Sequence, residues 1–162
     1  MTTDPPLPPR QLGLDLAPSA AHGAPPVFSI GHSNRPIGDF VALLRAAQVA
    51  HVADIRSVPF SRRHPQFSRE PLARSLAEAG IGYSHWPALG GKRPDAGAGP
   101  LGAYVDYMRT PPFVAALREL AAAARRTRLA FMCAEAAPSD CHRRYVAAAL
   151  ELEGLAVAHI VR

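Results

Sequence analysis

The chain has 162 residues, of which 48 % are hydrophobic, so one domain with a buried core is expected and two large domains are excluded. No apolar run reaches the roughly 20 residues that span a bilayer, and the N-terminus lacks the apolar core of a signal peptide. The net charge of +5 suits an anionic partner. Two cysteines do not form a disulfide scaffold. We therefore expect a cytoplasmic protein with reduced thiols and no membrane partner.

Residues 1–26 are predicted to form a disordered or loosely extended tail, because prolines interrupt this stretch repeatedly and exclude regular structure. These prolines are Pro5, Pro6, Pro8, Pro9, Pro18, Pro25 and Pro26. The folded domain is predicted to cover residues 27–162.

Strand-like and helix-like patterns alternate through the domain. The expected strands are Val27–Gly31, His51–Arg56, Ile81–Trp86, Leu129–Met132 and Ala156–Val161. This alternation predicts an α/β fold, a single three-layer domain with a mostly parallel five-stranded sheet and helices on both faces. A Gly/Pro-rich stretch over residues 87–102 is long enough for a lid or a binding loop.

Polar residues follow three of the predicted strands. They are His32, Ser33, Asn34 and Arg35 after the first, Asp54 and Arg56 at the second, and Cys133, Glu135, Cys141, His142 and Arg143 after the fourth. Because parallel strands end at one edge of a sheet, these groups should converge there, where open α/β sheets bind ligands. The convergence indicates an anion-handling or thiol-dependent site. The alternative is a set of helix caps and ion pairs that tie turns to strands.

Each group has a possible chemical role. Cys141 or Cys133 would be the nucleophile or a redox partner, with His32 or His142 moving protons and Glu135 and Asp54 nearby. Asp140 is expected to cap the helix after it, which would place Cys141 where exposed N–H groups favour a thiolate. The anion would be held by residues with hydroxyl, amide or guanidinium donors, namely Ser33, Asn34, Arg35, Arg56, Arg62, Arg63 and Arg143. Packing roles remain open for both cysteines.

A metal ion is the rival chemistry. Cys133, Cys141 and His142, joined by His32 or Glu135, offer ligand atoms, although their spacing matches no familiar zinc motif. The sequence itself requires no cofactor and leaves the oligomeric state open.

The loop over residues 56–69 is basic and carries two phenylalanines, Phe60 and Phe67, so it has the composition for gripping phosphates and stacking bases. A solvated basic loop is the plainer interpretation. No recognition helix, zinc finger or RNA-recognition signature accompanies it.

Several separated motifs resemble the domain-of-unknown-function 488 family. They are Ile30-Gly-His-Ser-Asn-Arg35, Asp54-Ile-Arg-Ser57, Pro65-Gln-Phe67, Leu89-Gly-Gly91, Cys133-Ala-Glu135 and Cys141-His-Arg143. The resemblance runs from about Val27 to Arg162. It implies a bacterial cytosolic α/β domain with a shared polar site.

A second resemblance, topological in kind, is to rhodaneses. In that family an aspartate and an arginine close the second strand, as Asp54 and Arg56 do here, and a catalytic cysteine follows the fourth strand, where Cys133 lies. In this chain the turn from Cys133 to Arg143 is longer, holds a second cysteine and lacks a glycine-containing loop.

Two functional hypotheses follow. The first is a small enzyme, a thiol-dependent transferase or hydrolase, acting on an anionic nucleotide or nucleic-acid-related substrate through a Cys/His/Arg site. The second is a non-catalytic nucleic-acid-binding module that uses the basic loop 56–69. An enzyme should enclose the motif residues in a pocket, whereas a binding module should present a continuous positive surface.

Overall fold

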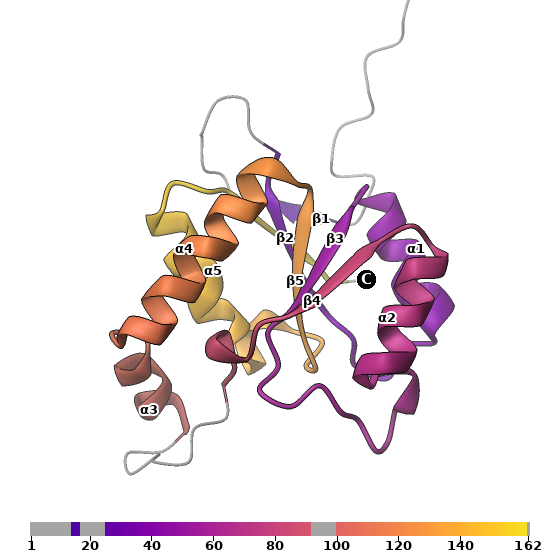
Figure 1. Ribbon diagram of the computed structural model, residues 1–162, viewed down its shortest axis with the longest axis horizontal. Coiled ribbons are helices and arrows are strands. Elements are labelled where there is room, and N and C mark those ends of the chain that lie inside the picture. The colour runs from indigo at the N-terminus through magenta and orange to yellow at the C-terminus, as the bar shows by residue number, and fades with distance from the viewer. Residues whose placement is uncertain (1–13, 17–24, 92–99, 162) are drawn as a thin grey trace, which may run out of the picture.

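The computed structural model describes residues 14–16, 25–91 and 100–161 (Figure 1). The five predicted strands form one parallel sheet, which confirms the predicted fold class. They are β2 (Val27–Gly31), β3 (His51–Asp54), β4 (Gly82–His85), β5 (Leu129–Cys133) and β6 (Val157–Ile160). Their order across the sheet is β6-β2-β5-β3-β4.

Helices cover both faces of the sheet and complete the three layers (Figure 1). On one side lie α1 (Ile37–Ala46) and α2 (Arg69–Glu78), and on the other lie α3 (Pro100–Tyr107), α4 (Pro111–Arg126) and α5 (Arg143–Leu152). Each side has its own buried apolar cluster between helices and sheet.

Strand β5 shows how the sequence produces these two clusters. All five of its residues are buried, as expected for a central parallel strand covered on both faces. Its side chains alternate, so that Ala130 and Met132 join the cluster under α1 and α2. Leu129, Phe131 and Cys133 join the cluster under α4 and α5. The first cysteine therefore lies at the carboxyl end of the central strand, on the α4/α5 side.

One short segment of the predicted disordered tail, residues 1–26, forms a strand. Leu14–Leu16 forms a short strand, β1, that pairs antiparallel with β6 at the sheet edge, with Leu14 opposite Ile160 and Leu16 opposite Ala158. A Leu-Asp-Leu segment has strand-like alternation, and the unpaired edge of β6 supplies its hydrogen bonds. The rest of the predicted tail, apart from Pro25 and Pro26, lies outside the described residues, as do residues 92–99 of the predicted lid loop.

The connections reverse direction between β2 and β5. The helix after β2, α1, lies on one face of the sheet, and the helix after β5, α5, lies on the other, although the two strands are neighbours. Such a reversal leaves a crevice beyond the carboxyl ends of the two strands, which is the usual ligand position in open α/β sheets.

The start of α5 differs from the prediction. Pro138–Asp140 forms a 3₁₀ turn, and α5 begins only at Arg143, with His142 at its N-cap. Asp140 therefore does not cap this helix, because the proline-led turn places it too early. Cys141 lies just before the helix rather than in its first turn.

Candidate functional site

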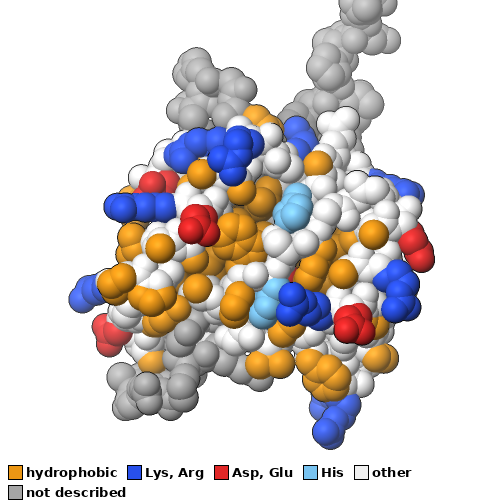
Figure 2. Space-filling view, in the orientation of Figure 1, with side chains coloured by type: hydrophobic (Ala, Val, Ile, Leu, Met, Phe, Trp, Pro, Cys, Tyr) orange, Lys and Arg blue, Asp and Glu red, His pale blue; other side chains and the backbone are white. Residues whose placement is uncertain are grey.

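A cavity of about 600 Å³ opens at the reversal between β2 and β5. Six of the predicted site residues line it, and they come from three strand ends: His32, Arg56, Cys133, Glu135, Cys141 and His142. On the face shown in Figure 2, hydrophobic and histidine side chains lie between scattered Lys and Arg side chains. The predicted convergence of polar groups at one sheet edge therefore occurs for these six residues.

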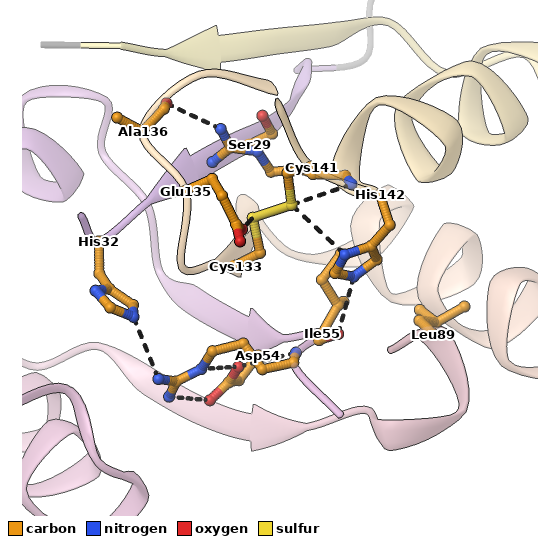
Figure 3. The surroundings of a disulfide bond; sticks show 12 residues. Ser29, His32, Asp54, Ile55, Leu89, Cys133, Glu135, Ala136, Cys141 and His142 are labelled. Atoms are coloured by element: carbon orange, nitrogen blue, oxygen red, sulfur yellow. Dashed lines mark hydrogen bonds and ion pairs between the residues drawn. A yellow bond between two sulfur atoms is a disulfide. The ribbon is translucent and has the colours of Figure 1, made fainter. Parts of the chain in front are cut away.

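The two cysteines face each other across the turn after β5 and are joined as a disulfide (Figure 3). Their Cα atoms are 7.5 Å apart. The Sγ atom of Cys133 lies 3.5 Å from Oε2 of Glu135. One ligand atom from each of Cys133, Glu135 and Cys141 falls within 4.8 Å of the others. The sequence predicted this grouping, but the disulfide contradicts the expectation of reduced thiols. The path of the turn, which the sequence does not fix, brings the two sulfurs together.

Cys141 has two nitrogen neighbours. The backbone N–H of Arg143 donates to its Sγ atom at 3.4 Å, and Nδ1 of His142 lies 3.5 Å from the same sulfur. On its other side, the imidazole places Nε2 at 3.2 Å from the carbonyl oxygen of Ile55. A carbonyl only accepts, so Nε2 carries the proton and Nδ1 presents a lone pair to the sulfur.

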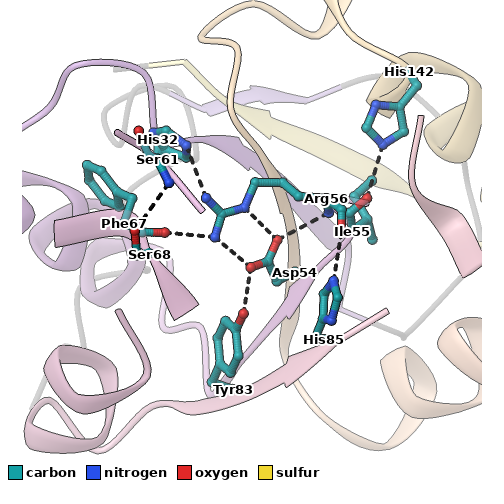
Figure 4. A network of polar contacts seen from close by, with 10 residues as sticks. All are labelled: His32, Asp54, Ile55, Arg56, Ser61, Phe67, Ser68, Tyr83, His85 and His142. Carbon is teal, nitrogen blue, oxygen red and sulfur yellow. Dashed lines mark hydrogen bonds and ion pairs between the residues drawn. The ribbon is translucent and has the colours of Figure 1, made fainter. Parts of the chain in front are cut away.

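Asp54 and Arg56 form a buried ion pair on the α1/α2 side of the cavity (Figure 4). The carboxylate accepts from Nε of Arg56 at 2.9 Å, from its NH2 group at 2.7 Å, and from the hydroxyl of Tyr83 at 2.6 Å. The same NH2 group donates to the carbonyl of Phe67 at 2.8 Å. Burial and the neighbouring carboxylate raise the pKa of Tyr83 well above its usual range. The guanidinium is thus fixed at the cavity wall, with its charge balanced by Asp54.

His32 joins this network from the loop after β2. Its ring stacks on Phe67 with centroids 4.5 Å apart, and Nδ1 donates to the carbonyl of Ser33 at 2.8 Å. The NH1 group of Arg56 approaches Nε2 at 3.4 Å. Burial is the main cause that lowers the pKa of His32 to about 4. At neutral pH it is therefore an uncharged imidazole that accepts at Nε2 on the cavity wall.

Arg143 is fully buried under the turn after β5. Its NH2 group donates to the carbonyl of Ala136 at 3.0 Å, whereas Nε and NH1 have no hydrogen-bond partner in the described part of the chain. Burial lowers the pKa of Arg143 to about 10, partly offset by the charge of Glu135. The guanidinium remains a cation at neutral pH and lies where it attracts the Glu135 carboxylate.

The remaining predicted residues do not line the cavity. Asp54 lies behind Arg56, and Arg35 donates to the carbonyls of Gly31 and Val161. Arg62 and Arg63 are exposed on the loop that supplies Ser61 to the cavity. Ser33 and Asn34 hydrogen-bond each other at the turn after β2. Substrate binding by these side chains stays a prediction.

Phe60 was predicted to stack bases, whereas the other residues described next were not predicted as parts of the cavity wall. Ser57, Val58, Phe60 and Ser61 line it from the loop after β3, and Gly91 and Tyr104 line it from the opposite side. A Cβ atom at Gly91 would collide with the His142 ring, so glycine there makes room for the imidazole. For Val58, an apolar side chain in a polar loop next to Phe60 was the available signal.

Chemically, the site combines a sulfur pair, two imidazoles, a fixed guanidinium and an exposed carboxylate. Cys133, Glu135 and Cys141 also offer clustered ligand atoms of types that suit a metal ion such as zinc, and His142 lies beside Cys141. Among the described residues, no helix is long and apolar enough to cross a membrane.

No curated protein and no solved structure matches the chain. None of the comparisons shows the likeness to rhodaneses. The family resemblance is confirmed: the model of the family described as "Domain of unknown function DUF488" matches residues 36–150, and the chain belongs to this family.

Proposed function

We propose that the cavity is the active site of a thiol-dependent enzyme that acts on a small anionic substrate, a nucleotide or a nucleic-acid component. The observation that carries the proposal is the enclosure of both cysteines, His32, His142 and Arg56 in one cavity of about 600 Å³. That volume lies within the roughly 300–1,000 Å³ typical of small-molecule sites.

Cys141 is the proposed nucleophile, in the reduced state of the protein. A thiol reductant converts the disulfide to two thiols by supplying two electrons and two protons, and is itself oxidised to a disulfide. The N–H group of Arg143 then stabilises the Cys141 thiolate by hydrogen bonding. Cys133 faces the Glu135 carboxylate instead, which disfavours a negative charge on its sulfur. The two sulfurs therefore have different surroundings and different expected reactivity.

The imidazoles supply the proton transfers. Nδ1 of His142 is the acceptor next to Cys141, and its orientation is set by the hydrogen bond from Nε2 to Ile55. His32 stands on the other wall as a neutral acceptor. Substrate bound between them would have a base on each side.

The loop after β3 provides the contacts for an anion with an aromatic part. The side chains of Val58 and Phe60 are 56 % and 66 % exposed at the cavity, which leaves an aromatic face for stacking. The exposed guanidinium groups of Arg62 and Arg63 follow directly in the chain.

The proposal is tested with reduced protein and a panel of nucleoside monophosphates, diphosphates and short oligonucleotides. Thermal stabilisation by a mononucleotide is expected, and it should be lost in Phe60→Ala and in Arg62→Ala/Arg63→Ala. Arg118→Ala/Arg126→Ala removes the same charge from α4 and serves as the matched control. Turnover of the bound compound should require Cys141, and Cys141→Ser should keep binding while losing turnover.

The second candidate, a nucleic-acid-binding module, is favoured by the same exposed Phe60, Arg62 and Arg63. On the face shown in Figure 2, Lys and Arg side chains are spread over the surface rather than joined in one patch. Binding of long DNA or RNA that weakens steeply with salt, without any binding of mononucleotides, would favour this candidate. Loss of turnover only in Cys141→Ser would favour the enzyme.

A further inference from the structure

We propose that the reduced protein holds one zinc-class divalent ion between Cys133, Glu135, Cys141 and His142, at the floor of the cavity. Metal binding is measured without any substrate, so this inference does not rest on the proposed enzymatic activity.

The distances between the donor atoms carry the inference. The separation from Sγ of Cys133 to Oε2 of Glu135 is 3.5 Å, and that from Sγ of Cys141 to Nδ1 of His142 is also 3.5 Å. Tetrahedral zinc with bonds of about 2.3 Å to sulfur and about 2.0 Å to nitrogen or oxygen places such pairs about 3.5 Å apart. The ligand atoms of Cys133, Glu135 and Cys141 also lie within 4.8 Å of one another, and Nδ1 of His142 approaches this group at Cys141.

The backbone leaves room for the sulfurs to separate around an ion. The Cα atoms of the two cysteines are 7.5 Å apart, beyond the roughly 4.4–6.8 Å common for disulfide-bonded pairs. Reduction by a thiol, with two electrons and two protons, gives two thiols. These release two protons when their thiolates bind the ion.

The surroundings of the four groups also resemble those of metal ligands. The Nε2 atom of His142 donates to the carbonyl of Ile55, which aims Nδ1 at the sulfur and fixes the tautomer that a ligand needs. The backbone N–H of Arg143 donates to Sγ of Cys141. The buried guanidinium of Arg143 acts on Glu135 and balances an ion site that carries two thiolates and a carboxylate.

Metal binding and nucleophilic attack by Cys141 exclude each other in one molecule, since a coordinated thiolate is occupied. The oxidised protein is expected to bind no ion, because a disulfide offers no thiolate. The sulfur pair would thus exist in three forms: disulfide, free dithiol and metal-bound dithiolate.

The test is a zinc titration of the full chain, reduced with a phosphine, stripped with a chelator and then desalted, against a competing chromogenic chelator. One ion per chain is expected. Cys133→Ser and Cys141→Ser should each weaken binding by at least about 100-fold, and Glu135→Gln and His142→Gln by about 10–100-fold. Asp140→Asn and His32→Gln change the other carboxylate and the other imidazole of the cavity and should leave the affinity unchanged. Bound Co²⁺ should show thiolate charge-transfer absorption that disappears in the cysteine variants.

Two outcomes overturn the inference. One is zinc binding to the reduced protein no tighter than to Cys133→Ser/Cys141→Ser. The other is a zinc affinity that depends on the cysteines but is unchanged in Glu135→Gln and His142→Gln, which would mean that only the two sulfurs bind the ion. Glu135 is exposed, so its variant folds and keeps the test decisive even where a buried cysteine variant does not. Failure of zinc binding leaves the nucleotide and turnover assays untouched, so the two proposals fail separately.

Discussion

At the scale of single residues, Asp54 is the polar group on which the cavity wall depends. Its buried carboxylate accepts hydrogen bonds from Arg56 and Tyr83, and Arg56 in turn donates to the carbonyl of Phe67. Because the guanidinium is buried with its partner, removing the carboxylate leaves a charge in the interior without compensation.

We expect Asp54→Ala to lower the free energy of unfolding by about 3–5 kcal/mol, as for other broken buried ion pairs. Tyr83→Phe removes one hydrogen bond to the same carboxylate and should cost only about 1 kcal/mol. Urea denaturation under reducing conditions measures both. An Asp54→Ala protein as stable as Tyr83→Phe would mean that Arg56 finds another anion or reaches water.

The two thiols are expected to react at different rates. With reductant and chelator present, iodoacetamide should alkylate Cys141 in Cys133→Ser faster than it alkylates Cys133 in Cys141→Ser. The reason is that Cys141 accepts an N–H hydrogen bond, whereas Cys133 is 1 % exposed and faces Glu135. Mass spectrometry of time points at one pH gives the two rates, and a faster Cys133 would reverse the nucleophile assignment.

His51 predicts a pH dependence of stability. Burial lowers the pKa of His51 below its ordinary value, so below about pH 6.5 the unfolded chain binds more protons than the folded one. Stability should therefore fall as the pH drops from 7.5 toward 5. His32, whose pKa is lowered to about 4, contributes in the same direction, so His51→Gln should make this part of the profile shallower without removing the slope. Ser84→Ala keeps the imidazole but removes its hydroxyl partner. It should lower stability at every pH while leaving the slope in place.

At the scale of elements, β1 is the least anchored strand. It pairs through three residues with the edge strand β6, whereas β5 has partners on both sides.

The boundaries of the elements were predicted less well than the elements themselves. The strands were readable as apolar runs, but the 3₁₀ turn Pro138–Asp140 shifted the start of α5.

Deletion of residues 1–24 should lower the melting temperature by no more than about 4 °C, the shift that about 1 kcal/mol causes in a domain of this size. Deletion of residues 1–13, which keeps β1, is the matched control and should have a smaller effect. Calorimetry of both truncated chains decides the matter. A larger drop in the control would show that stability resides upstream of β1.

At the scale of the whole molecule, the sequence predicts which polar side chains meet at the sheet edge better than it predicts their hydrogen-bond partners. The cavity residues were readable because parallel strands end at one edge, which brings His32, Arg56 and Cys133 together without knowledge of distances. The hydrogen bond from the Tyr83 hydroxyl to Asp54 depends on the register of β3 against β4, and no local sequence pattern predicts that register. The burial of Arg143 was equally unreadable, since arginine at a helix start is ordinarily solvated.

The position of β5 predicts how the whole domain folds. A chain ending at Thr127 retains β2, β3 and β4 but loses the strand that lies between β2 and β3. We expect this fragment to show no cooperative thermal transition, because β2 would have no parallel neighbour left in the sheet. A sigmoidal circular-dichroism melt of the fragment would contradict this prediction.

The central place of β5 has a consequence for the order of events during synthesis on the ribosome. The strand that fills the centre of the sheet, between β2 and β3, is also the strand that ends in Cys133, and Cys141 follows only eight positions later. Both thiols therefore emerge after β2, β3 and β4 have been made. When β5 pairs between β2 and β3, the Sγ atom of Cys133 comes to line the same cavity as His32 and Arg56. The nascent chain thus exposes no cysteine before the strand that shelters it can be placed. Insertion of β5 joins β2 to β3 and brings Cys133 to the cavity in the same step.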